Sequence, residues 1–89
     1  MEEALLKITG DVQGVFYRDN AKEEATSLNL KGFVKNMPGG NVVACVQGEK
    51  EKIEDFITWC HEGSPSAKVD HVEVTWREPL DNFNSFEIT

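Results

Sequence analysis

The organisation of this chain follows from one stretch near its start, Val12-Gln13-Gly14-Val15-Phe16-Tyr17-Arg18. A strand-like run ends near Asp11 and a helical pattern begins near Asp19, so the stretch is predicted to be a loop between a strand and a helix. Backbone N–H groups at a helix start are unsatisfied donors at the positive end of a dipole, so such a loop can receive an anion. Gly14 lets the backbone come close, and Arg18 can hold two phosphate oxygens at once. A single Arg after a glycine turn is also a common solvated surface residue, and these residues alone leave both interpretations open.

Hydrophobic periodicity outlines the elements on either side of this loop. In residues 4–12 every second position is apolar or glycine, and the positions between are polar apart from Leu5, which is the period of a strand with one face on a core. After the loop, apolar side chains recur at spacings of four, four and three, at Tyr17, Ala21, Ala25 and Leu28. That spacing predicts a helix, and Asn29 is its expected end because asparagine tolerates a left-handed helix cap.

A hairpin and a second helix are predicted in the middle of the chain. Two β-rich runs, 32–36 and 42–47, flank the segment 37–41, which is dense in turn-forming residues. Apolar residues at helical spacing follow, at Ile53, Phe56, Ile57 and Cys60. Gly63-Ser64-Pro65 ends this pattern, so the second helix is expected to stop there.

The predicted order is β-α-β-β-α-β with a short strand added at the end. Strand-like alternation covers 72–77, and Phe86 with Ile88 marks the last strand. An antiparallel sheet with both helices on one face accommodates this order, which is the ferredoxin-like α+β sandwich. The 89 residues suffice for one such core, so we expect a single domain over residues 1–89. This fold hosts unrelated functions and does not settle the activity.

Composition narrows the choice of partners and compartment. A formal net charge of −7 opposes long-range attraction to nucleic acid or anionic lipid, so neither partner is expected. The acidic start Met1-Glu2-Glu3 runs directly into a strand pattern, and no apolar run is long enough to span a membrane, so we expect a cytoplasmic protein. Cys45 and Cys60 lack disulfide or zinc spacing and are expected to be buried apolar residues. No feature calls for a metal or cofactor, and we expect a monomer.

Two segments of the sequence resemble the signatures of the acylphosphatase family. They are Gly10-Asp11-Val12-Gln13-Gly14-Val15-Phe16-Tyr17-Arg18 and Gly32-Phe33-Val34-Lys35-Asn36, the second followed by Gly40. The resemblance extends through Gly63-Ser64-Pro65 to the Phe86-Glu87-Ile88 ending and so covers essentially the whole chain. It implies hydrolysis of small-molecule acyl phosphates to a carboxylate and inorganic phosphate, without metal or cofactor.

The resemblance also implies roles for individual residues. Arg18 would bind the phosphate together with loop residues Gln13, Gly14, Val15, Phe16 and Tyr17, and Asn36 would position the attacking water. Three positions depart from the usual family pattern, namely Asn29, Pro38 and Gly39. Pro38 and Gly39 lie just after Asn36, so they affect the geometry of the hairpin and with it the direction of the Asn36 side chain.

Other functional classes compete with this hypothesis. The adjacent Cys60 and His61 cannot form a catalytic pair, because neighbouring residues on a helix point in different directions. An RNA-recognition domain shares the element order, but residues 42–47 carry neither an aromatic nor a basic residue. A small regulatory domain that binds an anion without turnover stays open on the sequence.

Overall fold

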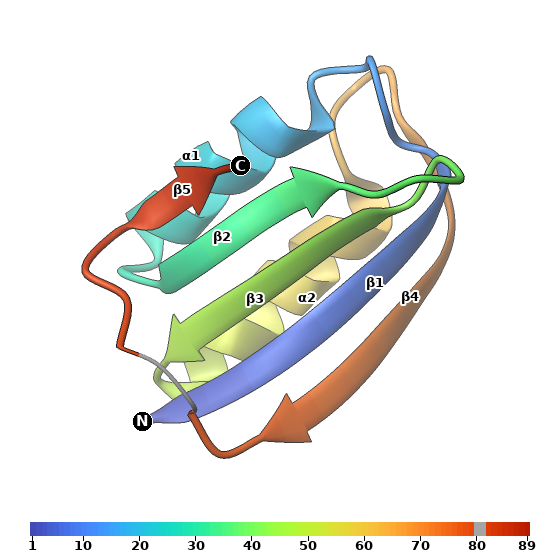
Figure 1. Ribbon diagram of the computed structural model, residues 1–89. Coiled ribbons are helices and arrows are strands. Elements are labelled where there is room, and N and C mark those ends of the chain that lie inside the picture. The colour runs from blue at the N-terminus through green and yellow to red at the C-terminus, as the bar shows by residue number, and fades with distance from the viewer. Residues whose placement is uncertain (80–81) are drawn as a thin grey trace.

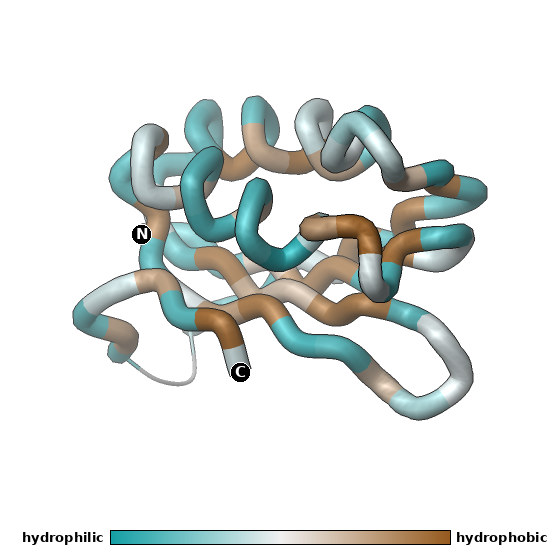
Figure 2. The backbone as a smooth tube through the Cα atoms, turned by 90° about the horizontal axis from the view of Figure 1, so that it is seen from above, coloured by the Kyte–Doolittle hydropathy of each residue, from teal (hydrophilic) through white to brown (hydrophobic). Residues whose placement is uncertain are grey.

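A sheet covered on one face by two helices makes up the computed structural model, which describes residues 1–79 and 82–89 (Figure 1). The elements in chain order are β1 (Glu2–Asp11), α1 (Tyr17–Ser27), β2 (Lys31–Asn36), β3 (Val42–Gly48), α2 (Lys50–Glu62), β4 (Lys68–Arg77) and β5 (Phe86–Ile88). The order is the one predicted from periodicity. The two layers are seen in Figure 2, where the helices lie above the strands.

The strands follow the spatial order β4-β1-β3-β2-β5. The first four are joined antiparallel, as predicted. β5 differs, because it pairs with β2 in parallel, with Gly32 opposite Phe86 and Val34 opposite Ile88. The sheet is therefore mixed: β4 lies at one edge, and β5 adds to the other edge in the direction of β2.

Each helix buries three of the four side chains that its spacing predicted, and the fourth, Leu28 or Ile57, is partly buried against the core. Helix α1 buries Tyr17, Ala21 and Ala25, and α2 buries Ile53, Phe56 and Cys60. These side chains pack on the inward positions of the strands, which include Ala4, Leu6, Ile8, Val34, Val42, Ala44 and Val46. Alternation along β1 thus places one face on the core, as expected for a strand covered on one side.

The end of α1 confirms the predicted role of Asn29, whose φ is 58°. The N–H of Leu30 bonds to the carbonyl of Ala25 at 2.9 Å, and the N–H of Asn29 bonds to that of Thr26 at 3.1 Å. This is the Schellman pattern of a helix C-terminus, which needs one residue in the left-handed region. Asparagine fills that position at modest cost.

Neither helix in the described residues combines the length and hydropathy needed to cross a membrane.

Candidate active site

The loop between β1 and α1 has an unusual backbone. Gly14 has a φ of 74° and Phe16 a φ of 63°, whereas Val15 between them does not have a positive φ. A left-handed conformation costs little at glycine but is uncommon at phenylalanine. Two left-handed residues so close together bend the backbone sharply, and backbone turns of this kind can gather successive N–H groups into a concave surface that suits an anion.

Protein donors bind the carbonyl groups of this loop. The Ser64 hydroxyl donates to the carbonyl of Val15 at 2.7 Å. The side-chain amide and the backbone N–H of Asn20 donate to the carbonyl of Phe16, at 2.8 Å and 3.1 Å. No hydrogen bond found among residues 1–79 and 82–89 is donated by the backbone N–H of any residue from 13 to 18. The carbonyls of Val15 and Phe16 are thus engaged, while the N–H groups of residues 13–18 have no acceptor in the described part of the chain.

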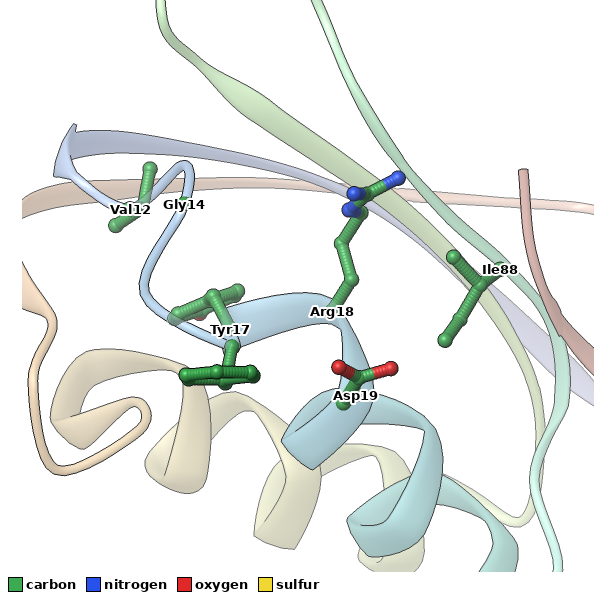
Figure 3. Close-up of a pocket in the computed structure, with 7 residues that line it drawn as sticks. Val12, Gly14, Tyr17, Arg18, Asp19 and Ile88 are labelled. Atoms are coloured by element: carbon green, nitrogen blue, oxygen red, sulfur yellow. The ribbon is translucent and has the colours of Figure 1, made fainter.

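A cavity of about 240 Å³ opens where this loop meets α1. Its lining comprises Val12, Gly14, Phe16, Tyr17, Arg18, Asp19 and Ile88 (Figure 3). In Figure 3 the Arg18 side chain extends from the first turn of α1 toward the sheet. Its guanidinium Nη1 donates a 3.4 Å hydrogen bond to the backbone oxygen of Thr89, and no side-chain carboxylate in the described part of the chain forms an ion pair with it. The site therefore combines free N–H donors with a guanidinium that is hydrogen-bonded to the backbone oxygen of Thr89.

Two aromatic side chains of the loop point in different directions. Tyr17 is buried, and its hydroxyl donates to the carbonyl of Cys60 on α2 at 2.9 Å. Burial raises the pKa of this phenol, so it stays a neutral donor. The side chain of Phe16 is 72% exposed. Tyr17 thus anchors the loop to α2, and in Figure 3 its ring points toward α2, whereas the Arg18 side chain points toward the sheet.

Asn36, the last residue of β2, pairs with Val42 at the start of β3. Its Oδ1 is buried and has no hydrogen-bond partner, the single side-chain atom of this kind found in the described residues. A buried acceptor without a partner costs about 1–3 kcal/mol, so a protein keeps one only for a reason. Asn36 does not itself line the cavity around Arg18.

The side chain of Gln13 links the loop to the β2–β3 turn that follows Asn36. Its Nε2 donates to the carbonyl of Met37 at 2.9 Å and to that of Asn41 at 2.8 Å. The side-chain amide is therefore occupied, and the residue has only its backbone N–H to offer an anion. The structure thus joins the two sequence segments that carry Arg18 and Asn36.

Neither cysteine has a catalytic partner in the described part of the chain. Both are buried, as predicted, whereas His61 is exposed. Burial raises the pKa of Cys45 to about 11 and that of Cys60 to about 12, so both stay thiols near neutrality. No group of three or more His, Cys, Asp or Glu side chains suited to a metal ion is found among residues 1–79 and 82–89.

Comparison with known proteins decides the family. The acylphosphatase family model matches residues 4–88. The chain belongs to the acylphosphatase family. It is 44% identical over 85 residues to the acylphosphatase of Anaeromyxobacter dehalogenans, which covers 96% of this chain and 91% of the relative. It is 46% identical over 76 residues to that of Thermococcus kodakarensis, covering 85% of this chain and 84% of the relative.

Solved acylphosphatases have the same fold. The crystal structure of acylphosphatase from Bacillus subtilis superposes with a TM-score of 0.97 at 31% identity, covering 100% of this chain and 99% of that one. The ferredoxin-like arrangement is therefore that of the family. Acylphosphatases are hydrolases, so this chain is an enzyme of that class.

Two contacts in this acylphosphatase site were not predicted from the sequence. Ser64 appeared only as part of a helix stop, and its bond to Val15 spans 49 positions of the chain. Gln13 was predicted only as one of the phosphate-binding loop residues, and the contact of its side chain with the β2–β3 turn was not foreseen. The sequence around Ser64 or Gln13 does not indicate which distant carbonyl the side chain will bond to.

Proposed function

We propose that the chain hydrolyses the carboxyl–phosphate bond of acyl phosphates, with Arg18 and the amides of residues 13–18 binding the phosphoryl group. The observation that carries this proposal is the loop itself, in which Ser64 and Asn20 bind the carbonyls of Val15 and Phe16 while the N–H groups of residues 13–18 have no acceptor among the described residues. Phosphate oxygens suit such donors, and a guanidinium adds charge and a two-pronged geometry. The short-range donors have to outweigh a net charge of −7.

Asn36 positions the water in this proposal. Its buried, unpartnered Oδ1 can accept a hydrogen bond from a water and direct a lone pair toward phosphorus. An amide is too weak a base to take the proton, so the substrate phosphate accepts it. The water oxygen bonds to phosphorus, the bond from phosphorus to the acyl oxygen breaks, and its electron pair leaves with the carboxylate.

No general acid is required for this reaction. The leaving carboxylate has a conjugate acid with a pKa of about 4, by analogy with side-chain carboxyls. The remaining tasks are charge stabilisation and alignment of the water, which fixed donors can supply. The reaction as proposed uses no metal or cofactor and is carried out by a cytoplasmic monomer folded as one domain over residues 1–89.

A hydrolysis assay with a synthetic aryl acyl phosphate tests the proposal. Release of phosphate is expected from the acyl phosphate but not from phenyl phosphate, because a phenol leaving group has a pKa of about 10 and this site offers no acid to protonate it. Activity should persist after treatment with EDTA, and inorganic phosphate should inhibit competitively. Binding of phosphate without any hydrolysis would make the chain a regulatory anion-binding domain instead.

A further inference from the structure

Gln13 makes two hydrogen bonds that use both hydrogens of its side-chain amide. The acceptors are the carbonyls of Met37 at 2.9 Å and Asn41 at 2.8 Å, which lie 24 and 28 positions away in the chain. A primary amide has two N–H donors, so Nε2 has no donor left for another acceptor. The side chain bridges two loops and is not available to hold a ligand through Nε2.

The two acceptors are the ends of the turn between β2 and β3. The N–H of Met37 donates to the carbonyl of Asn41 at 2.8 Å, which closes the turn at its base. Within the turn, Gly39 and Gly40 have φ values of 95° and 96°, and nothing lies within 4 Å of the place where a Cβ would be. On the side where a Cβ would point, neither glycine of the turn packs against the anion loop.

Asn36 immediately precedes this turn, so the placement of its side chain depends on where the turn is held. Its Oδ1 is buried and has no partner in the described residues, so no hydrogen bond of its own fixes that oxygen. Among residues 1–79 and 82–89, the hydrogen bonds found between residues 36–41 and residues 12–18 are the pair donated by Gln13.

We propose that Gln13 is a positioning residue, which holds Asn36 Oδ1 in register with the phosphate-binding loop through the carbonyls of Met37 and Asn41. This inference rests on the role given to Asn36 in the proposed function. Aligning a water to a reacting atom is sensitive to displacements of about 1 Å, which can cost about 10²-fold in rate. Phosphate binding depends on Arg18 and backbone N–H groups, so it should be far less sensitive to the loss of the two hydrogen bonds donated by the Gln13 side chain.

Two substitutions remove the hydrogen bonds from Gln13 to Met37 and Asn41 in different ways. Gln13→Ala deletes the donor, whereas Gln13→Glu keeps the size but, when ionised, places a carboxylate with no hydrogen against two carbonyl oxygens. Both should lower kcat by about 10-fold to 10²-fold. The dissociation constant of inorganic phosphate, measured by calorimetry on the folded Gln13→Ala variant, should change by less than about threefold, because the loop donors are retained. Amide hydrogen exchange at Gly40 should become faster.

A double-mutant cycle with Asn36→Ala separates positioning from general damage. If Gln13 acts through Asn36, adding Gln13→Ala to Asn36→Ala should lower kcat no further, because the water is already unaligned. Additive losses, equal losses of phosphate affinity and kcat, or an unchanged kcat in both Gln13 variants would each overturn the inference. An unchanged kcat in Asn36→Ala would overturn the role of Asn36 in the proposed function and this inference with it. If kcat falls strongly in Asn36→Ala but stays unchanged in both Gln13 variants, only the inference about Gln13 would be overturned, and the proposed role of Asn36 would stand.

Discussion

The hydroxyl of Ser64, just after α2, donates a 2.7 Å hydrogen bond to the carbonyl of Val15 in the loop before α1. Ser64 is 3% exposed, and the chain contains no cis peptide bonds in its described part. In a trans peptide the C=O and the following N–H point in opposite directions. By fixing the carbonyl of Val15, Ser64 therefore fixes the direction of the N–H of Phe16.

Ser64→Ala should weaken phosphate binding by about fivefold, the equivalent of one net hydrogen bond of about 1 kcal/mol. The matched control is Ser66→Ala, because Ser66 lies two positions away and is exposed. Calorimetric titration of phosphate into both variants measures the effect. Equal affinities in the two variants would mean that the loop amides do not depend on this contact.

Arg18→Ala should abolish phosphate binding and turnover together. The guanidinium is half-buried beside the cavity and has no ion pair in the described residues, so its charge is available to the ligand. Arg18→Lys should restore little, because one ammonium cannot match a two-pronged contact. Calorimetry and steady-state kinetics on the same preparations provide the measurement, with circular dichroism as the check on folding. Near-normal phosphate affinity in Arg18→Ala would exclude this arginine as the main anion ligand.

Asn36→Ala should lower kcat by about 10² or more while leaving phosphate affinity nearly intact, because a positioning contact is lost rather than a binding one. The buried Oδ1 has no partner to lose, so the melting temperature should not fall by the amount expected for a broken hydrogen bond. Thermal unfolding and kinetics measure the two effects. Equal losses of affinity in Asn36→Ala and Arg18→Ala would make Asn36 a ligand and contradict the mechanism.

Both cysteines should resist alkylation in the folded protein at pH 8. Burial raises the pKa of Cys45 to about 11 and that of Cys60 to about 12, and the thiolate is the reactive form. Activity should survive treatment with iodoacetamide, and mass spectrometry should find both thiols modified only after unfolding in denaturant. Rapid loss of activity with one thiol modified in the folded state would show that a cysteine lies at or near the site.

Glu3 should make the fold sensitive to acid. Burial by itself would raise the pKa of this carboxyl, but hydrogen bonds from Gln47 at 2.7 Å and from Arg77 outweigh it and hold the pKa below its usual value. The carboxylate therefore contributes stability above its unfolded-state pKa of about 4.3, and that contribution is lost as the pH falls through the lower folded-state pKa.

Comparison of the wild-type chain with Glu3→Gln tests this prediction. The difference between their urea midpoints should be largest at pH 7 and should shrink as the pH falls below about 4. The exposed Glu2 provides the control, and Glu2→Gln should show no comparable pH-dependent difference. A constant gap between wild type and Glu3→Gln from pH 7 to pH 2 would contradict the assigned linkage.

Local patterns were enough to locate every helix and strand of the described chain, although β4 begins at Lys68, before the predicted start at Val72. Alternation along β1 and the spacing of Tyr17, Ala21 and Ala25 reflect which side chains face the core. An inward-facing apolar residue recurs with each turn of a helix and every second residue of a strand, so the pattern can be recognised from the sequence. Asn29 was identified as the end of α1 because its left-handed tolerance is a property of one residue. The family resemblance, carried by contiguous residues, was likewise available before the fold was known and is confirmed.

Contacts between distant segments were decided only by the tertiary structure. The parallel pairing of β5 with β2 depends on which sheet edge the chain reaches after β4, and a three-residue strand carries no record of its partner. The orientation of the Gln13 amide is set by two carbonyls of a turn that the fold brings beside it. The unpartnered Oδ1 of Asn36 depends equally on its surroundings. Hydrogen-bond partners across loops are chosen by three-dimensional proximity, and one-dimensional periodicity does not encode that proximity.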